Sequence, residues 1–64
     1  MNIEKAIKLG SQILSKNNVK TFKLDSEVLM SSVLKKKRSF MILNSQDQLN
    51  KSSFNHYQNL IKQR

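Results

Sequence analysis

Few side chains of this 64-residue chain could carry out acid–base, nucleophilic or metal chemistry. His56 is the only histidine, cysteine is missing, and the acids number four, whereas a zinc site alone needs about three or four ligands. Asp25 and Glu27 are the closest carboxylates along the chain, but residues two apart on a helix point to different sides and make a poor acid–base pair. The single glycine, Gly10, excludes a glycine-rich phosphate loop. The sequence therefore predicts no catalytic, cofactor-binding or metal-binding residue.

The densest cluster of charge is a basic connector, Lys35, Lys36, Lys37 and Arg38. One interpretation is a solvated turn at the negative end of the preceding helix, where a cation is favoured by about 0.3–1 kcal/mol. The other is a contact surface for an acidic or phosphate-bearing partner, and a nuclear localisation signal is a weaker third hypothesis. We take these four residues as the candidate partner-binding site.

Length and composition indicate one small basic domain. Sixty-four residues bury only about 60% of the surface that they expose when unfolded, so stability should be modest. The net charge of +8 attracts polyanions or acidic protein surfaces, although a bias of the coding sequence towards lysine would produce the same charge without any role in binding. No apolar run is long enough to span a membrane, no secretory signal is recognisable, and we expect a cytoplasmic protein.

The first element expected along the chain is a helix over residues 3–16. Its N-cap would be Asn2, and Asn17 or Asn18 would take the left-handed position after its end. Gly10 lies on its apolar stripe, which predicts a close approach of another helix at that point. The stripe has helical spacing and consists of Ile3, Ala6, Ile7, Gly10, Ile13 and Leu14.

A second helix is expected over residues 22–35, with Thr21, or alternatively Asp25, as its N-cap. Apolar residues cover so much of its circumference that it should lie centrally in the bundle. An ion pair from Asp25 or Glu27 to Arg38 would tie it to the next element. The residues expected to face the core are Leu24, Val28, Leu29, Val33 and Leu34, with Met30 widening the face.

Residues 38–43 are expected to form a short third helix or turn, although periodicity alone does not exclude a strand. We expect its apolar side chains to be mostly buried. They are Phe40, Met41, Ile42 and Leu43.

A polar loop at residues 44–48 leads to a last helix over residues 51–63. Asn50 is its expected N-cap, and Leu49 and Phe54 have the spacing of a hydrophobic staple. The fold predicted from these elements is an all-α bundle of four, or five, helices. Phe22 is the one aromatic residue expected to be exposed, and His56 is expected at the surface.

The sequence of residues 24–43 resembles that of the N-terminal helical domain of the HemK/PrmC family. These proteins are methyltransferases that modify a glutamine of peptide chain release factors. Members carry a line close to L-D-A-E-x-L-L-x-x-V-L-x-x-x-R-x-x-L-L. The residues at matching places are Leu24, Asp25, Glu27, Leu29, Val33, Leu34, Arg38, Ile42 and Leu43.

The resemblance implies a substrate-recognition domain, with residues 1–64 as one unit. In the family, a separate Rossmann-like domain binds S-adenosylmethionine and carries an Asn-Pro-Pro-Tyr motif, and it acts on the Gly-Gly-Gln loop of the release factor. Neither that motif nor a cofactor loop occurs in this chain, so the catalytic domain is expected to be absent from it. Ser26 stands in place of the usual alanine, Phe22 where proline is common, and Lys35 where glycine is common. Because Lys35 has a Cβ, we expect the second helix to end without a left-handed residue there.

The leading hypothesis is therefore a monomeric domain that binds a release factor for a protein-(glutamine-N5) methyltransferase. A small basic nucleic-acid-binding protein is the alternative, in which the second helix, the connector and the third helix would form a helix-turn-helix. The third segment is too short and apolar to offer a polar reading face, which favours the first hypothesis.

Overall fold

The computed structural model describes residues 1–63, and these form four helices. They are α1 (Ile3–Lys16), α2 (Phe22–Leu34), α3 (Arg38–Leu43) and α4 (Lys51–Lys62). The all-α bundle with a short third helix is confirmed, and residues 38–43 are a helix rather than a strand. α2 and α4 each end one residue before the end of the range expected from the sequence.

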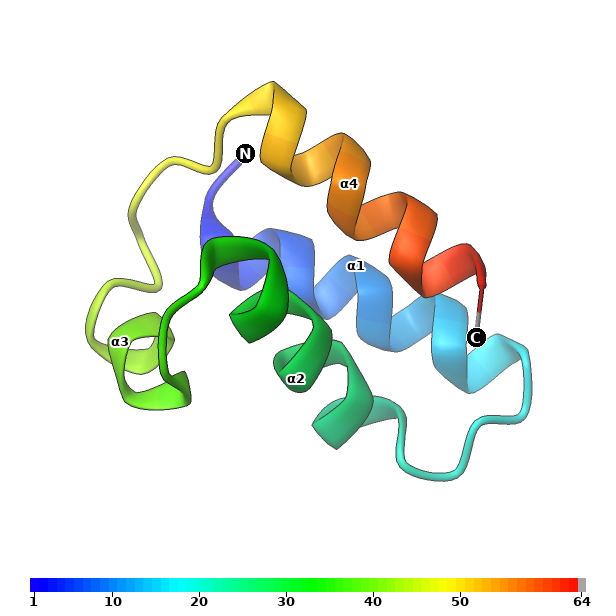
Figure 1. Ribbon diagram of the computed structural model, residues 1–64. Coiled ribbons are helices and arrows are strands. Elements are labelled where there is room, and N and C mark those ends of the chain that lie inside the picture. Colours follow the sequence, from blue (N-terminus) through cyan, green and yellow to red (C-terminus); the bar gives the residue numbers. More distant parts are fainter. Residues whose placement is uncertain (64) are drawn as a thin grey trace.

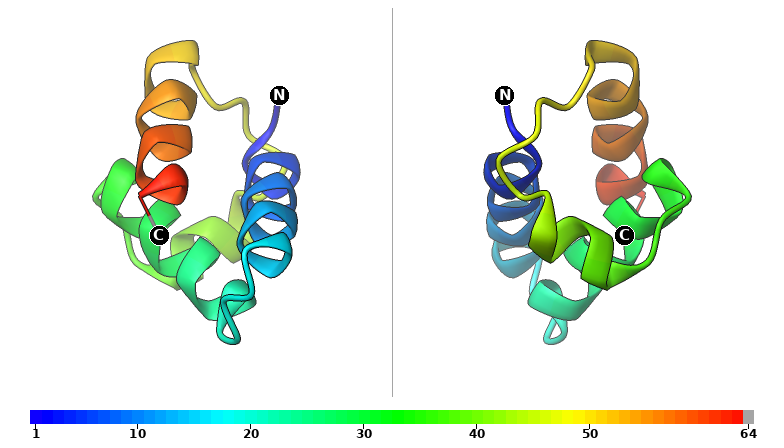
Figure 2. Two further views of the ribbon diagram at one scale, coloured as in Figure 1. Left: turned by 90° about the vertical axis from the view of Figure 1, so that its right-hand side faces the viewer. Right: turned by 90° about the vertical axis from the view of Figure 1, so that its left-hand side faces the viewer.

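The three long helices pack on one another, and α3 lies at one end of the bundle (Figure 1). α2 contacts α1, α3 and α4, which confirms its predicted central place. The side views show α1 and α4 next to each other, with α2 below both (Figure 2). The overall extents are 29 × 22 × 17 Å.

Asparagine side chains begin two of the helices as the sequence predicts. Oδ1 of Asn2 accepts a hydrogen bond from the Lys5 amide at 2.8 Å, and Oδ1 of Asn50 accepts one from the Ser53 amide at 2.7 Å. Each side chain thereby satisfies one of the amides that a helix N-terminus leaves without a partner. Thr21 does precede α2, but its side chain makes no capping bond.

The end of α1 is closed by a left-handed asparagine. Asn18 has φ 64°, and the Val19 amide donates to the Leu14 carbonyl at 3.0 Å. This bond and that from the Asn18 amide to the Ser15 carbonyl are those of a Schellman motif. The prediction that Asn17 or Asn18 would take this conformation is confirmed, by the second of them.

Tyr57 of α4 is the centre of the core, at the point where the three long helices meet. Its ring packs against Gly10 of α1 so closely that a Cβ there would lie 2.8 Å from the ring carbon Cζ. Its hydroxyl donates to the Ser26 carbonyl of α2 at 3.1 Å. Gly10 and Ser26 are both buried, so small residues on two helices make the space that the tyrosine fills. The predicted close approach at Gly10 is confirmed.

The buried hydrophobic residues form one cluster that draws on α1, α2, α3, α4 and the loop before α4. Leu49 and Phe54, the predicted staple, lie in and against this cluster. The buried members are Ile3, Ala6, Leu14, Met30, Met41, Leu49, Tyr57 and Ile61.

The expected core face of α2 is wrong for two of its residues, Leu24 and Val28. Leu24 and Val28 are 48% and 44% exposed, while Met30 and Ser26 are fully buried. Val28 is two residues from Met30, which places it roughly 160° away around the helix. Leu29, Val33 and Leu34 are half-buried against the cluster. Because α2 is apolar on nearly all sides, hydrophobicity did not indicate which side faces the core.

The expected burial of α3 is also wrong for half of its apolar residues. Met41 is buried and Phe40 half-buried, but Ile42 and Leu43 are 74% and 84% exposed. Successive helical residues turn by roughly 100°, so four apolar residues in a row cannot all face one neighbour. Phe22, expected to be exposed, is half-buried and packs against the core.

His56 is exposed, as predicted. No helix among residues 1–63 has the length and apolar character needed to cross a bilayer.

Burial makes Tyr57 a source of pH-dependent stability, because desolvation raises the pKa of its phenol above the ordinary value of 10.0. A group whose pKa is raised on folding stabilises the fold below its unfolded pKa and loses that contribution as the pH rises further. We therefore expect the free energy of unfolding to fall more steeply above about pH 10 in the wild type than in Tyr57→Phe. Urea denaturation at a series of pH values measures this difference. The two proteins differ only in the phenol hydroxyl, so the comparison isolates it, and parallel curves would contradict the expectation.

Candidate binding site

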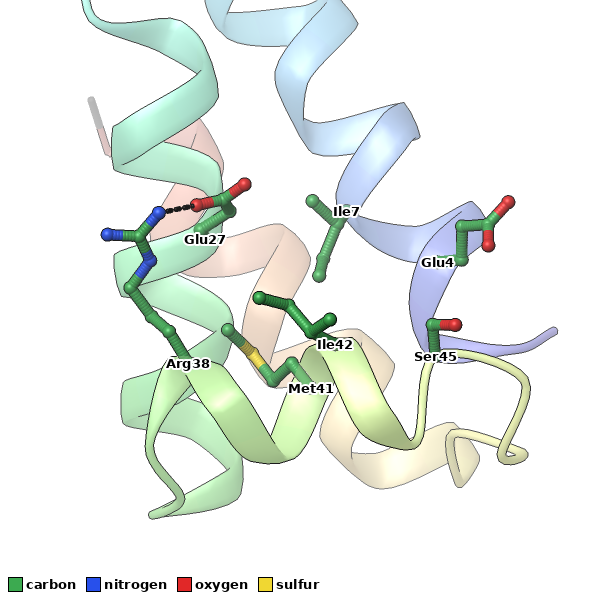
Figure 3. Close-up of a pocket in the computed structure, with 7 residues that line it drawn as sticks. All are labelled: Glu4, Ile7, Glu27, Arg38, Met41, Ile42 and Ser45. Carbon is green, nitrogen blue, oxygen red and sulfur yellow. Dashed lines mark hydrogen bonds and ion pairs between the residues drawn. The ribbon is translucent and has the colours of Figure 1, made fainter.

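A hollow on the described surface lies between α1, α2 and α3, and has a volume of about 190 Å³. Its apolar floor and wall are Ile7, Met41 and Ile42 (Figure 3). Polar side chains surround this apolar part, and they are Glu4, Glu27, Arg38 and Ser45. We call this hollow the α3 pocket.

One side of the α3 pocket is built by an ion pair between α2 and α3. Nη2 of Arg38 lies 2.5 Å from Oε2 of Glu27, so the predicted pairing is confirmed with Glu27 as the acid. The arginine is 54% exposed and the glutamate 35%. An exposed pair contributes little stability, about 0–1 kcal/mol, but it fixes the two side chains at the edge of the pocket. Asp25 is the alternative partner that the structure does not use.

The opposite side is built by the loop before α4, which folds back on the start of α1. The Glu4 amide donates to the Ser45 carbonyl at 3.0 Å, and the Ile3 amide donates to the Asp47 carbonyl at 3.1 Å. Nε2 of Gln46 donates to Oε2 of Glu4 at 2.9 Å. These bonds satisfy helix amides and hold Glu4 and Ser45 beside α3.

The basic connector ends at Arg38, the arginine that borders the α3 pocket. Lys35, Lys36 and Lys37 are all exposed. The ammonium of Lys36 lies 5.3 Å from the centre of the Phe40 ring, within reach of a cation–π interaction. Arg38, by contrast, is engaged with Glu27, so the three lysines are the cations of the connector that are directed to solvent.

This arrangement combines an apolar hollow with exposed cations. Among residues 1–63, no three His, Cys, Asp or Glu side chains gather where they could hold a metal ion. The hydroxyl of Ser31 donates to the Lys36 carbonyl beyond the end of α2. Gly10, the only glycine, is inside α1 against Tyr57, so this chain contains no glycine loop that could hold S-adenosylmethionine.

The sequence located one part of the site and missed the other. The basic connector lies where the sequence puts it, and whether it binds a partner remains a prediction. The α3 pocket was missed because Glu4 and Ile7 come from the first helix, about forty residues from Met41 and Ile42. One signal was present: the four consecutive apolar residues from Phe40 to Leu43 cannot all be buried by a helix of six residues.

Residues 5–64 match the protein family described as the PrmC N-terminal domain. The chain belongs to this family. The match covers nearly the whole chain, and it confirms the resemblance drawn from residues 24–43. It relates the chain to PrmC-type methyltransferases. Comparisons with curated proteins and with solved structures gave no match.

The structure of this PrmC N-terminal domain shows how two residues that differ from the usual family sequence are accommodated. Ser26, where alanine is usual, is buried beside Tyr57, and its hydroxyl is satisfied by the Lys23 carbonyl at 2.8 Å. Lys35, where glycine is common, has φ 56° and ψ 40°. The expectation that lysine would avoid the left-handed conformation is wrong. The amides of Lys35 and Lys36 both donate to the Ser31 carbonyl and close the helix.

The left-handed lysine predicts a stabilising substitution. A residue with a Cβ pays about 1–2 kcal/mol in this conformation, and glycine does not. Lys35→Gly should therefore raise the free energy of unfolding by about 1 kcal/mol. Chemical denaturation checks this, with Lys36→Gly as the matched control, since it removes the same charge at a position without positive φ. Equal effects of the two substitutions would contradict the role of φ.

Proposed function

We propose that this PrmC N-terminal domain recognises a peptide chain release factor on behalf of an S-adenosylmethionine-dependent protein-(glutamine-N5) methyltransferase. The catalytic domain of the parent enzyme would bind the cofactor and methylate the glutamine of the Gly-Gly-Gln loop. This domain would hold another part of the release factor. Such an enzyme is expected in the cytoplasm, where translation takes place.

The observation that carries the proposal is the family match over residues 5–64, together with what the fold presents on its surface. The described residues offer an apolar pocket beside three exposed lysines. A surface of that kind contributes affinity and orientation for a protein substrate. It lowers the KM for the whole substrate without taking part in the chemical step.

The alternative, nucleic-acid binding through α3, is less well supported. A recognition helix places polar and charged side chains against the base edges of a groove. α3 has six residues, and its exposed side chains include the apolar Ile42 and Leu43. The net charge of +8 would still attract nucleic acid without sequence preference at low salt.

Methylation kinetics test the proposal. The parent enzyme with and without residues 1–64 would be assayed on a whole release factor and on a short Gly-Gly-Gln peptide. We expect the deletion to raise the KM for the whole factor about tenfold or more, which corresponds to about 1.4 kcal/mol of binding. The peptide reaction should be unchanged, and it shows that the catalytic domain is still folded. An unchanged KM for the whole factor would overturn the proposal.

A further inference from the structure

The α3 pocket has the shape and lining of a site for one large apolar side chain. Its volume of about 190 Å³ exceeds that of an engineered cavity of about 150 Å³ that takes a benzene ring. Ile7, Met41 and Ile42 come from two helices and converge on the same space (Figure 3). Ile42 is 74% exposed although it lines the pocket, so an occupant would remove much of its surface from water.

The two ends of the α3 pocket differ in charge. Arg38 lies at one end and Glu4 at the other, with the apolar side chains between them (Figure 3). Arg38 and Glu27 neutralise each other, but the lysines at 35–37, immediately before Arg38, leave that end strongly positive. Among residues 1–63, the Glu4 carboxylate accepts a hydrogen bond from the neutral amide of Gln46 and pairs with no cation, so the other end is negative.

The charges around the α3 pocket restrict which kind of partner can bind there. A second copy of the chain would bring two proteins of charge +8 together, which repel each other. An anionic membrane would suit the lysines, but it would also place lipid phosphates near Glu4 and Glu27 at the pocket edge. A peptide segment can place its own acids over the connector and keep them away from Glu4, so it fits both ends at once.

We infer that the α3 pocket receives one large apolar side chain from an acidic segment of the partner protein, whose carboxylates lie over Lys35–Lys37. The inference rests on the proposed function, because it assigns the surface with which the release factor would be held. It also sets the direction of the segment: its acidic residues face the connector, and a neutral or basic part lies near Glu4.

The apolar part of the inference is tested by two neighbouring substitutions. Ile42→Asp puts a charge into the pocket, whereas Leu43→Asp adds the same charge one residue later, at a side chain that is 84% exposed and does not line the pocket. Fluorescence anisotropy would measure the affinity of each variant for a labelled release factor. We expect Ile42→Asp to weaken binding about tenfold or more, and Leu43→Asp to change it by less than about twofold. Equal losses would overturn the inference.

The electrostatic part needs a control of equal charge. Lys36→Glu/Lys37→Glu alters the connector, and Lys16→Glu/Lys20→Glu makes the same change in net charge at the opposite end of the bundle, where α1 leads to α2 (Figure 1). We expect the first pair to weaken binding about tenfold and to reduce its dependence on salt, and the second pair to have a clearly smaller effect. Equal effects would mean that the overall charge, rather than the connector, attracts the partner.

The outcomes separate this inference from the proposed function. If the wild-type chain does not bind a release factor at low salt, the proposed function fails. If it binds and Ile42→Asp binds equally well, only the pocket assignment fails. Sedimentation that shows a dimer broken by Ile42→Asp would assign the pocket to a second copy. Binding to phosphatidylglycerol vesicles that Ile42→Asp abolishes would assign it to a membrane, and either result would overturn the inference.

Discussion

Tyr57→Ala is expected to leave the domain largely unfolded. The side chain is 1% exposed and fills the space between Gly10 and Ser26, so its removal leaves a cavity where three helices meet. Truncation of a large buried aromatic residue costs about 3–5 kcal/mol. A chain of this length has a total stability of only about 3–10 kcal/mol. Circular dichroism and thermal denaturation measure the remaining helix content and cooperativity.

The control for this substitution is His56→Ala, one residue earlier in α4. His56 is exposed, so its replacement should change the free energy of unfolding by less than about 0.5 kcal/mol. If both variants melted like the wild type, Tyr57 would not be the residue on which the helix packing depends.

Met30→Ala should cost about 2–5 kcal/mol, because the side chain is fully buried and the cavity can close only in part. Leu24→Ala removes a similar amount of hydrocarbon from the same helix at a side chain that is 48% exposed. We expect it to cost less than about 1 kcal/mol. Urea denaturation measures the free energy of unfolding of both variants. The two values can be compared directly if the free energy depends on urea concentration with the same slope in each.

This pair decides which face of α2 packs on the core. The hydrophobic pattern alone placed Leu24 and Val28 inside, and the structure places Met30 and Ser26 there. A larger loss for Leu24→Ala than for Met30→Ala would mean that α2 is rotated about its axis relative to the structure.

The elements that sequence reasoning located well are those with a distinct polar side or a capping residue. α1 has a single apolar stripe and begins at Asn2, and α4 begins at Asn50 after the buried Leu49. In these cases local chemistry determines where the helix starts and which side is buried. The interior glycine also predicted a close packing contact, because Gly10 lies on the apolar stripe.

The elements that sequence reasoning misplaced are those with apolar residues on all sides. In α2 the buried face is chosen by shape, since Ser26 is small enough to let Tyr57 approach and donate to its carbonyl. In α3 the choice is made by the connection to α2, which turns Met41 inward and leaves Ile42 and Leu43 in solvent. Neither effect can be derived from hydrophobicity alone, because both depend on a partner distant in sequence.

The candidate binding surface, like the helices, could be predicted only in part from the sequence. The basic connector and an ion pair from Asp25 or Glu27 to Arg38 follow from local sequence, and the structure shows Glu27 as the acid. The α3 pocket does not follow from local sequence, since it forms only when the loop containing Ser45 binds the first amides of α1 and brings Glu4 beside α3. The charged part of the binding surface could be predicted from the sequence. Its apolar part could be located only from the three-dimensional structure.

The most direct test of the central claim, recognition of a release factor by this domain, is an NMR titration of the ¹⁵N-labelled chain with an unlabelled release factor. We expect saturable shifts or broadening of the amides of Lys35–Arg38, Ile42 and Ile7, with little change at the far end of α1 around Lys16 and Lys20. Ile42→Asp should remove the response without altering the rest of the spectrum. Spectra that do not change when release factor is added at low salt would contradict the claim.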